Sequence, residues 1–347
     1  MDSFGLLNTT WFALIGLLWA GFMFLEGFDF GVGITTPILA KDEIDRRLCL
    51  NSIGPVWDGN EVWLLVAGGA TFAAFPLWYA RMFSGFYLAL FLLLLGLIVR
   101  GVSFEFRGKD DRLQWRRVWS MANFAGSLIP AIVLGAAFTD LAHGLPLASG
   151  GRYFGGLIGL LHPVALLGAL AAVAVFSLHG SLFLALKTTG DLSERSRLFA
   201  SKAGAVGAVL LGATVVWIAT GHRQTLPGSA NGWVPLGLAI AAVFAVALGS
   251  VLATFGREGL AFVSTGSAIL LSMGAAFARM FPAVLPASNR VANSLTIGAA
   301  SSQHYTLVVM SVVAAVFTPL VLAYQGWTYW IFRQRLVRPP IERAVSS

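Results

Sequence analysis

The chain has 347 residues, of which 57% are hydrophobic and only 11% are charged, and its formal net charge is +7. Soluble domains carry about 25% charged residues, so this chain has too little polar surface to face water on all sides. The composition therefore excludes an ordinary soluble protein and predicts an integral membrane protein.

Long apolar stretches follow one another along almost the whole chain. A membrane-crossing helix needs about 20 mostly apolar residues, and nine stretches meet this requirement. We therefore predict a single membrane domain (1–347) of class all-α, polytopic, with a short tail (333–347). The nine spans are expected at residues 10–38, 54–79, 82–103, 118–139, 157–186, 202–221, 232–254, 258–281 and 304–332.

Basic residues are distributed unevenly between the two ends of these spans. With nine spans, 18 of the 23 Lys and Arg residues fall on the side of the C-terminal tail. The positive-inside rule then places the C-terminus in the cytoplasm and the N-terminus outside. Topology accounts for the positive charge, so no nucleic-acid partner is predicted. The first span is too long for a signal-peptide core and is interpreted as an uncleaved helix.

Four acidic residues lie inside the first two spans: Glu26, Asp29, Asp58 and Glu61. Each charge costs about 2.5–3.5 kcal/mol to insert into the bilayer, so these residues point to function. Each pair is three residues apart and shares one helix face. From the helical rise, Asp29 is expected about 14 Å from the cytoplasmic end, and the other pair about 6–12 Å from it. No acid after Asp111 is expected deep in a span.

A third ionisable group, Arg100, Glu105 and Lys109, is expected at the cytoplasmic end of the third span. Together these groups could form a ladder from the cytoplasm to the middle of the bilayer. Three interpretations stay open: a proton relay between desolvated carboxyls, ion pairs in which Arg100 and Arg81 fix helix packing, and the cation site of a transporter.

Histidines and cysteine give little support for a metal or haem centre in this chain. His162 and His179 lie about 25 Å apart on one helix and cannot hold one haem between them. His143, His222 and His304 are expected in outer loops or at the outer interface. Cys49, the only cysteine, is expected in a cytoplasmic loop and has no disulfide partner. No metal or cofactor site is predicted here.

Several motifs, in the same order, resemble subunit II of the cytochrome bd quinol oxidases. They are GFDFGVG at 27–33, WDGNEVWL at 57–64, AGGA to FP at 67–76, RGVSFE at 100–105, NSLTI at 293–297 and YTL at 305–307. The resemblance covers nearly the whole chain. It implies nine helices built as two four-helix bundles, about 10–139 and 157–281, plus a ninth helix at 304–332.

The resemblance also implies a place in a complex of the bacterial cytoplasmic membrane. Subunit I would carry the b and d haems and oxidise quinol, and this chain would bind no haem and supply protons from the cytoplasm for reduction of oxygen to water. Asp58, Glu105 and Lys109 match the family's proton path, and Asp29 and Glu26 match buried acids. Trp57, Asn60, Glu61 and Arg100 are expected to support them.

Two positions depart from the family pattern. Aspartate is common where Glu105 stands, and glutamine is common where Glu61 stands, so Glu61 has no inherited role. Some members hold a structural quinone in this subunit, and the sequence leaves a quinone or lipid here open, along with small accessory subunits. The rival functions are a proton- or cation-coupled transporter using the four span carboxylates, and a scaffold for subunit I.

Overall fold

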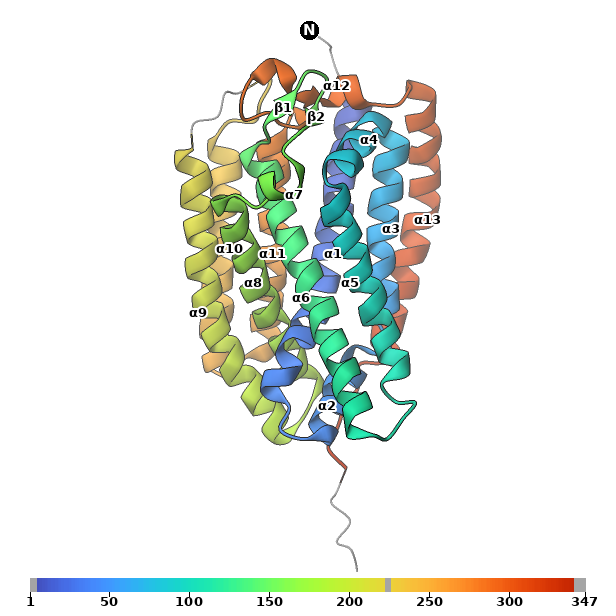
Figure 1. Ribbon diagram of the computed structural model, residues 1–347, viewed down its shortest axis with the longest axis vertical. Coiled ribbons are helices and arrows are strands. Elements are labelled where there is room, and N and C mark those ends of the chain that lie inside the picture. Colours follow the sequence, from blue (N-terminus) through green and yellow to red (C-terminus); the bar gives the residue numbers. More distant parts are fainter. Residues whose placement is uncertain (1–4, 222–225, 340–347) are drawn as a thin grey trace, which may run out of the picture.

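Helices make up most of the computed structural model, which describes residues 5–221 and 226–339 (Figure 1). The helices are α1 (Leu6–Leu39), α2 (Glu43–Ile53), α3 (Trp57–Ala74), α4 (Pro76–Gly85), α5 (Tyr87–Phe106), α6 (Leu113–His143), α7 (Gly156–Gly159), α8 (Pro163–Lys187), α9 (Gly190–Thr220), α10 (Trp233–Thr254), α11 (Glu258–Met280), α12 (Ile297–Ala300) and α13 (His304–Ile331), with a 3-10 turn η1 (Val291–Asn293). The strands are β1 (Leu147–Ala148), β2 (Arg152–Tyr153), β3 (Ala283–Leu285) and β4 (Leu295–Thr296).

Eight helices of the described chain are long and apolar enough to cross a membrane: α1, α5, α6, α8, α9, α10, α11 and α13. The predicted span at 54–79 corresponds to the 18-residue α3 and the start of α4. The helix is interrupted between them at Phe75, and Pro76 is the first residue of α4. Proline suits this position because an N–H group there would have no partner within the helix. The all-helical membrane fold is confirmed, whereas the count of nine and the division into two bundles stay predictions.

Two segments differ from the sequence prediction. The loop predicted after the first span forms α2, because the Asp42 carboxylate accepts a hydrogen bond from Asp45 N at 2.9 Å and caps the helix. Cys49 lies buried on this helix. The predicted span at 157–186 is also interrupted: α7 is a single short turn, and the long helix begins only at Pro163.

Helix α1 crosses α8 at very short range. A Cβ atom built on Gly31 would lie 1.8 Å from the Phe176 carbonyl oxygen, and one on Gly180 would lie 2.4 Å from backbone atoms of α1. A Cβ on Gly27 would meet the Phe176 ring at 2.9 Å. Gly27 and Gly31 thus allow close helix approach, as expected where lipid provides no hydrophobic drive for packing.

The two ends of the bundle are closed differently. At the end near the N-terminus, two short antiparallel hairpins, β1–β2 and β3–β4, form a cap (Figure 1). Asn289 and Asn293 side chains both donate to the Leu147 carbonyl, at 2.9 and 2.6 Å, and join the two hairpin regions.

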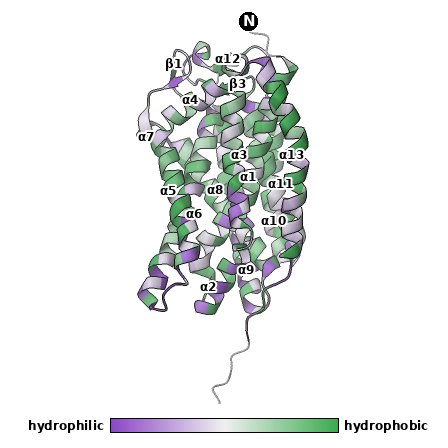
Figure 2. Cartoon of the chain, turned by 90° about the vertical axis from the view of Figure 1, so that its right-hand side faces the viewer, coloured by the Kyte–Doolittle hydropathy of each residue, from purple (hydrophilic) through white to green (hydrophobic). Residues whose placement is uncertain are grey.

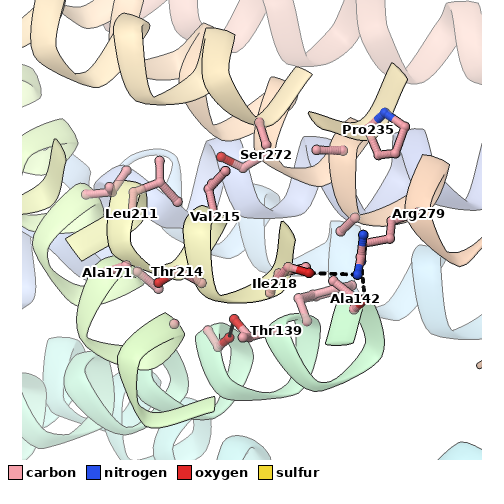
Figure 3. Close-up of a pocket in the computed structure, with 18 of the residues that line it drawn as sticks. Thr139, Ala142, Ala171, Leu211, Thr214, Val215, Ile218, Pro235, Ser272 and Arg279 are labelled. Carbon is pink, nitrogen blue, oxygen red and sulfur yellow. Dashed lines mark hydrogen bonds between the residues drawn. The ribbon is translucent and has the colours of Figure 1, made fainter. Parts of the chain in front are cut away.

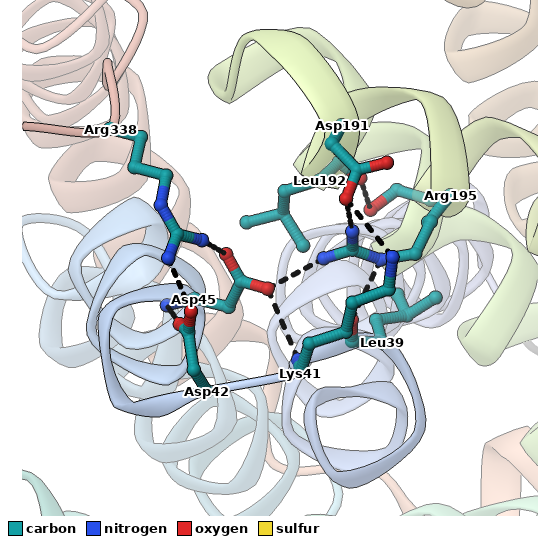
Figure 4. Close-up of polar contacts among 9 residues, drawn as sticks. Leu39, Lys41, Asp42, Asp45, Asp191, Leu192, Arg195 and Arg338 are labelled. Atoms are coloured by element: carbon teal, nitrogen blue, oxygen red, sulfur yellow. Dashed lines mark hydrogen bonds and ion pairs between the residues drawn. The ribbon is translucent and has the colours of Figure 1, made fainter. Parts of the chain in front are cut away.

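At the other end, ion pairs hold the C-terminal segment against α2 (Figure 4). The buried Asp45 carboxylate accepts hydrogen bonds from Arg195 at 2.6 Å and from Arg338 at 2.8 Å. Arg338 also pairs with Asp42, and Arg195 with Asp191. The chain is thus fixed to the bundle up to residue 338, while residues 340–347 of the predicted tail lie outside the described residues.

The outer surface of the bundle is apolar (Figure 2). Large side chains such as Phe91 on α5, Phe244 on α10 and Leu320 on α13 are 52, 71 and 61% exposed. So large an apolar surface is unusual on a soluble protein and is suited to lipid.

Candidate functional site

A buried arginine joins the acidic residues of the first two predicted spans. Arg100 on α5 is fully buried, and its Nη1 donates to Glu26 Oε2 on α1 at 2.6 Å. Its Nη2 lies 3.9 Å from Asp29 Oδ2, and its Nη1 lies 4.0 Å from Glu61 Oε2 on α3. Arg100 therefore belongs to the deep acidic group, and its predicted place beside Glu105 and Lys109 at the cytoplasmic end was wrong.

The cluster has three carboxyl groups and one guanidinium. Glu26 and Asp29 are completely buried, whereas the Glu61 side chain is 26% exposed. Phe30 and Phe104 lie against the guanidinium, with ring centroids 5.0 and 5.7 Å from its Cζ atom. These rings exclude water from the arginine and contribute cation–π attraction.

Asn60 connects this cluster to the last long helix. Its amide Nδ2 donates to Asp29 Oδ2 at 2.7 Å, and its Oδ1 accepts from Tyr329 Oη at 2.7 Å and from Gln325 Nε2 at 3.3 Å. Trp63 Nε1 donates to Gln325 Oε1 at 2.9 Å. All three hydrogen bonds of the Asn60 side chain are consistent with one orientation of its amide, with the NH2 group toward Asp29.

Tyr329 and Gln325 were missed by the sequence analysis. Their signal was available: these two polar side chains, four residues apart, share one face of a mostly apolar helix. What the sequence could not reveal was their partner, because Asn60 lies 269 residues from Tyr329.

The expected entrance residues lie at the surface. Asp58, in the first turn of α3, and Glu105 and Lys109, near the end of α5, are all exposed. No hydrogen bond or ion pair of their side chains to another described residue is found. Asp58 is one helical turn before Glu61, and Trp57 stacks on Phe104, with centroids 4.9 Å apart. The structure thus brings Glu61, Asn60, Arg100, Asp29 and Glu26 together but leaves the entrance residues separate.

A second polar pair lies at the opposite end of the bundle. Asp140, in the last turn of α6, is completely buried, and its Oδ1 lies 2.6 Å from His162 Nε2. The His143 and His162 ring centroids are 5.5 Å apart. Burial lowers the pKa of His162, which favours its neutral form. Asp140 lies beyond the predicted end of this span at residue 139, because the helix runs four residues further than predicted, and it is near the end of the helix rather than deep in it.

His179, on α8, is enclosed by aromatic rings of α1 and α11. Its Nδ1 lies 2.7 Å from Thr265 Oγ1, and its ring stacks on Phe262 with centroids 4.3 Å apart. Over residues 5–221 and 226–339, no group of three or more His, Cys, Asp or Glu side chains could hold a metal ion.

A cavity of about 320 Å³ lies between α6, α8, α9, α10 and α11 (Figure 3). Its walls are mostly apolar, with Thr139, Thr214 and Ser272 as scattered polar groups. At one end, Arg279 donates to the Ala142 and Ile218 carbonyls at 3.0 and 2.8 Å. The space suits an apolar chain rather than a polar substrate.

The fold and the cluster define a polytopic helical membrane protein whose reactive groups are buried carboxyls arranged around one arginine. Comparison with known families narrows this class. The model of the family "Cytochrome bd terminal oxidase subunit II" matches residues 7–332. The chain belongs to this family and is a component of a respiratory quinol oxidase complex, integral to the bacterial membrane.

Individual relatives agree with the family match. The chain is 41% identical to cytochrome bd ubiquinol oxidase subunit 2 of Bacillus subtilis, over 95% of this chain and 97% of the relative. It is 36% identical to the cytochrome bd-I ubiquinol oxidase subunit 2 of Escherichia coli K12, over the whole of both chains. The solved bd oxidase of Geobacillus thermodenitrificans has a similar fold, with a TM-score of 0.72, 16% identity and coverage of 94% of this chain and 98% of that one.

Proposed function

We propose that this chain is the haem-free subunit of a cytochrome bd-type oxidase and provides the path by which cytoplasmic protons reach the oxygen-reducing centre. The observation that carries the proposal is the Arg100 cluster, where three carboxyl groups meet in an apolar interior, one of them partly open to the surface. Burying a charged carboxylate in a membrane protein costs free energy, so carboxyl groups found there are expected to have a function, and we propose that these bind and release protons.

The charge balance of the cluster supports proton binding. With Glu26, Asp29 and Glu61 all ionised, one arginine leaves two negative charges uncompensated in a low-dielectric interior. Uncompensated buried charge is strongly disfavoured, and a proton is the smallest species that neutralises a carboxylate. Arg100 in turn keeps at least one carboxylate ionised. The cluster can therefore gain and lose protons while its side chains stay in place.

We place the entrance at the cytoplasmic end, where Lys109, Glu105 and Asp58 are exposed. From Asp58 a proton would pass to Glu61, one helical turn further along α3, and then to the cluster through Glu61, 4.0 Å from Arg100. Asp29 and Glu26 are the deepest acceptors. Asn60, by donating to Asp29, holds that carboxyl in place for transfer.

The partly open acids also point to the partner. Asp58 and Glu61 lie on the outer face of α3 within an apolar surface, and acidic side chains facing lipid are unfavourable. We infer that subunit I covers this face of α3. Small accessory subunits and lipid would occupy other parts of the surface.

The topology completes the proposal. We propose nine spans, including α3, with the N-terminus outside and the C-terminus in the cytoplasm. Subunit I would oxidise quinol near the outer surface, and its b and d haems would pass electrons to oxygen. Because quinol protons leave outside while water formation consumes cytoplasmic protons, charge is separated without a pump. The cavity beside Arg279 would accommodate a structural quinone or lipid chain.

The test is Asp58→Asn in the purified heterodimer. Oxygen consumption should fall at least tenfold, since general acid–base steps typically contribute about 10²–10⁴-fold, while the haem absorption spectrum stays unchanged. The matched control is Asp191→Asn, which removes an exposed cytoplasmic carboxylate outside the path. Unchanged turnover in an assembled Asp58→Asn complex would remove Asp58 from the path.

The two rival functions predict different results. A cation transporter is not favoured by the comparisons, and Arg100 already occupies the position between the carboxylates where a cation would bind. If the chain were only a scaffold, substitutions of the path residues could impair assembly of the complex, but they would not lower the turnover of complexes that assemble. Proton uptake by assembled Asp58→Asn and Glu105→Gln complexes separates a relay from a scaffold, because a scaffold variant that assembles should take up protons at the normal rate.

A further inference from the structure

A groove runs between α13 and the rest of the bundle on its cytoplasmic half. It consists of two adjoining cavities of about 450 and 370 Å³, which share Phe183, Phe262 and Tyr329 as lining residues. One wall belongs to α13 and the other to α1, α8 and α11. The shared residues make the two cavities one elongated space.

The deeper part of this groove is apolar. Phe28 and Phe183 stack with centroids 4.2 Å apart and form part of the wall opposite α13. Gly326 on α13 contributes no side chain, and a Cβ atom built there would meet nothing within 4 Å. The groove therefore has the shape and chemistry to accept a hydrocarbon chain lying along the helix.

The cytoplasmic mouth of the groove is cationic. Lys187, Arg333 and Arg335 line it. Lys187 donates to the Phe332 and Gln334 carbonyls, and the Arg333 guanidinium lies over the Trp330 ring at 4.4 Å. None of these three cations forms an ion pair with a described carboxylate, whereas other basic residues at this end, such as those in Figure 4, do. Each retains N–H donors for an external anion.

We propose that this groove binds one anionic phospholipid of the membrane. Its phosphate lies between Lys187, Arg333 and Arg335, and one acyl chain extends past Phe183 and Phe262 toward Gly326. Three cations at the inner membrane surface complement a headgroup with net negative charge better than a zwitterionic one. A neutral quinone ring offers them no charge. This inference is independent of the proposed proton path.

The bound lipid would also close one side of the buried cluster. Tyr329 lines both parts of the groove, and its Oη donates to Asn60, which in turn donates to Asp29. An acyl chain in the groove would exclude water from this hydrogen-bond chain. Loss of the lipid would hydrate Tyr329 and Asn60 from the α13 side.

The test measures lipid retained by the intact heterodimer. The complex is reconstituted in nanodiscs of phosphatidylcholine with a minor fraction of phosphatidylglycerol, then released and analysed by native mass spectrometry. One phosphatidylglycerol should be retained in preference to phosphatidylcholine. Each cation contributes about fivefold to this preference, so K187Q/R333Q/R335Q should abolish it. The control R117Q/K202Q/R257Q removes the same charge from other cytoplasmic positions, where the side chains form no ion pair with a described carboxylate, and should keep the preference.

A second pair of variants tests the apolar part. Gly326→Leu fills the groove, while Gly237→Leu places the same side chain on the exposed face of α10, where a Cβ also meets nothing. Only the first should lose the retained lipid. The proposal is overturned if the wild-type complex retains no anionic lipid selectively, if the triple variant keeps the preference, or if both leucine variants behave alike.

Photo-crosslinking keeps the test decisive if the variants do not assemble. Wild-type complex is irradiated with a phosphatidylglycerol carrying a photoreactive group on its acyl chain, and labelled peptides are mapped. Label on the peptides of Phe183, Phe262 and Tyr329 supports the proposal. Label confined to other surfaces overturns it.

Discussion

Arg100 is the residue whose loss should be most costly. It is completely buried, donates to Glu26 at 2.6 Å and lies within 4.0 Å of acids on two helices. Arg100→Met keeps the apolar stem and removes the charge, so the buried carboxyls lose the one cation that the described part of the chain places within 4.0 Å of them. Breaking a buried ion pair by removing one partner costs about 3–5 kcal/mol.

The same reasoning predicts a specific rescue. In Arg100→Met/Glu26→Gln the carboxylate closest to the missing guanidinium is also neutral, so less uncompensated charge stays buried. We expect the double variant to regain about 0.5–3 kcal/mol of the loss, the range seen for contacting residues in one network. Glu26→Gln alone should be mild, because its amide oxygen can still accept from Arg100.

The assay is the apparent unfolding temperature of the purified complex, measured at one scan rate because unfolding of such assemblies is rarely reversible. At about 2 °C per kcal/mol, Arg100→Met should lower it by roughly 6–10 °C. The exposed Arg117→Met is the matched control and should change it little. If the double variant is no more stable than Arg100→Met, or if Arg100→Met is as stable as wild type, the charge argument is wrong.

Three further predictions concern other contacts. Tyr329→Phe removes the 2.7 Å hydrogen bond to Asn60 and should cost about 1 kcal/mol with a fall in oxygen consumption; an effect on neither would contradict the positioning role. Burial opposes ionisation of Glu43, but hydrogen bonds and charge from Arg107 prevail and lower its pKa. Its stabilisation is therefore present above the ordinary carboxyl pKa and lost as the pH falls through the lowered value, so the stability gap between wild type and Glu43→Gln should close on acidification from neutral pH. Burial raises the pKa of the Cys49 thiol to about 12, so maleimide at mildly alkaline pH should label it only after denaturation; labelling of the folded complex would refute this.

The membrane class and the acidic residues were predictable because they depend on local sequence. The length of an apolar stretch identifies a membrane span, and an acidic residue within such a stretch is rare enough to be noticed. Gly27 and Gly31, four residues apart, likewise indicate a close helix crossing. Each of these signals lies within one helix.

The sequence allows ion pairs between Arg100 and the span carboxylates, and these form, but the predicted grouping of Arg100 with Glu105 and Lys109 failed for a geometric reason. Arg100 and Glu105 are five positions apart, or about 140° around a helix with 3.6 residues per turn, so they face different sides. Proximity in sequence suggested one group, whereas the helix directs Arg100 inward to Glu26 and leaves Glu105 exposed. Asp140 was missed because its burial depends on the length of α6 and on His162 across a loop.

The ninth predicted helix depends on a small number of contacts. Only 6% of the apolar window of α13 is buried within the chain, so hydrophobic packing against its own bundle contributes little to its position. Polar contacts fix it instead: Trp11 donates to Leu307 O at 3.1 Å near one end, and Tyr329 and Gln325 meet Asn60 near the other. The contacts of Tyr329 and Gln325 with Asn60, which hold α13, therefore belong to the same series of hydrogen bonds that ends on Asp29. Any molecule that moves α13, whether subunit I on its exposed face or a lipid in the groove behind it, acts directly on the Asn60 amide and through it on the buried carboxyl.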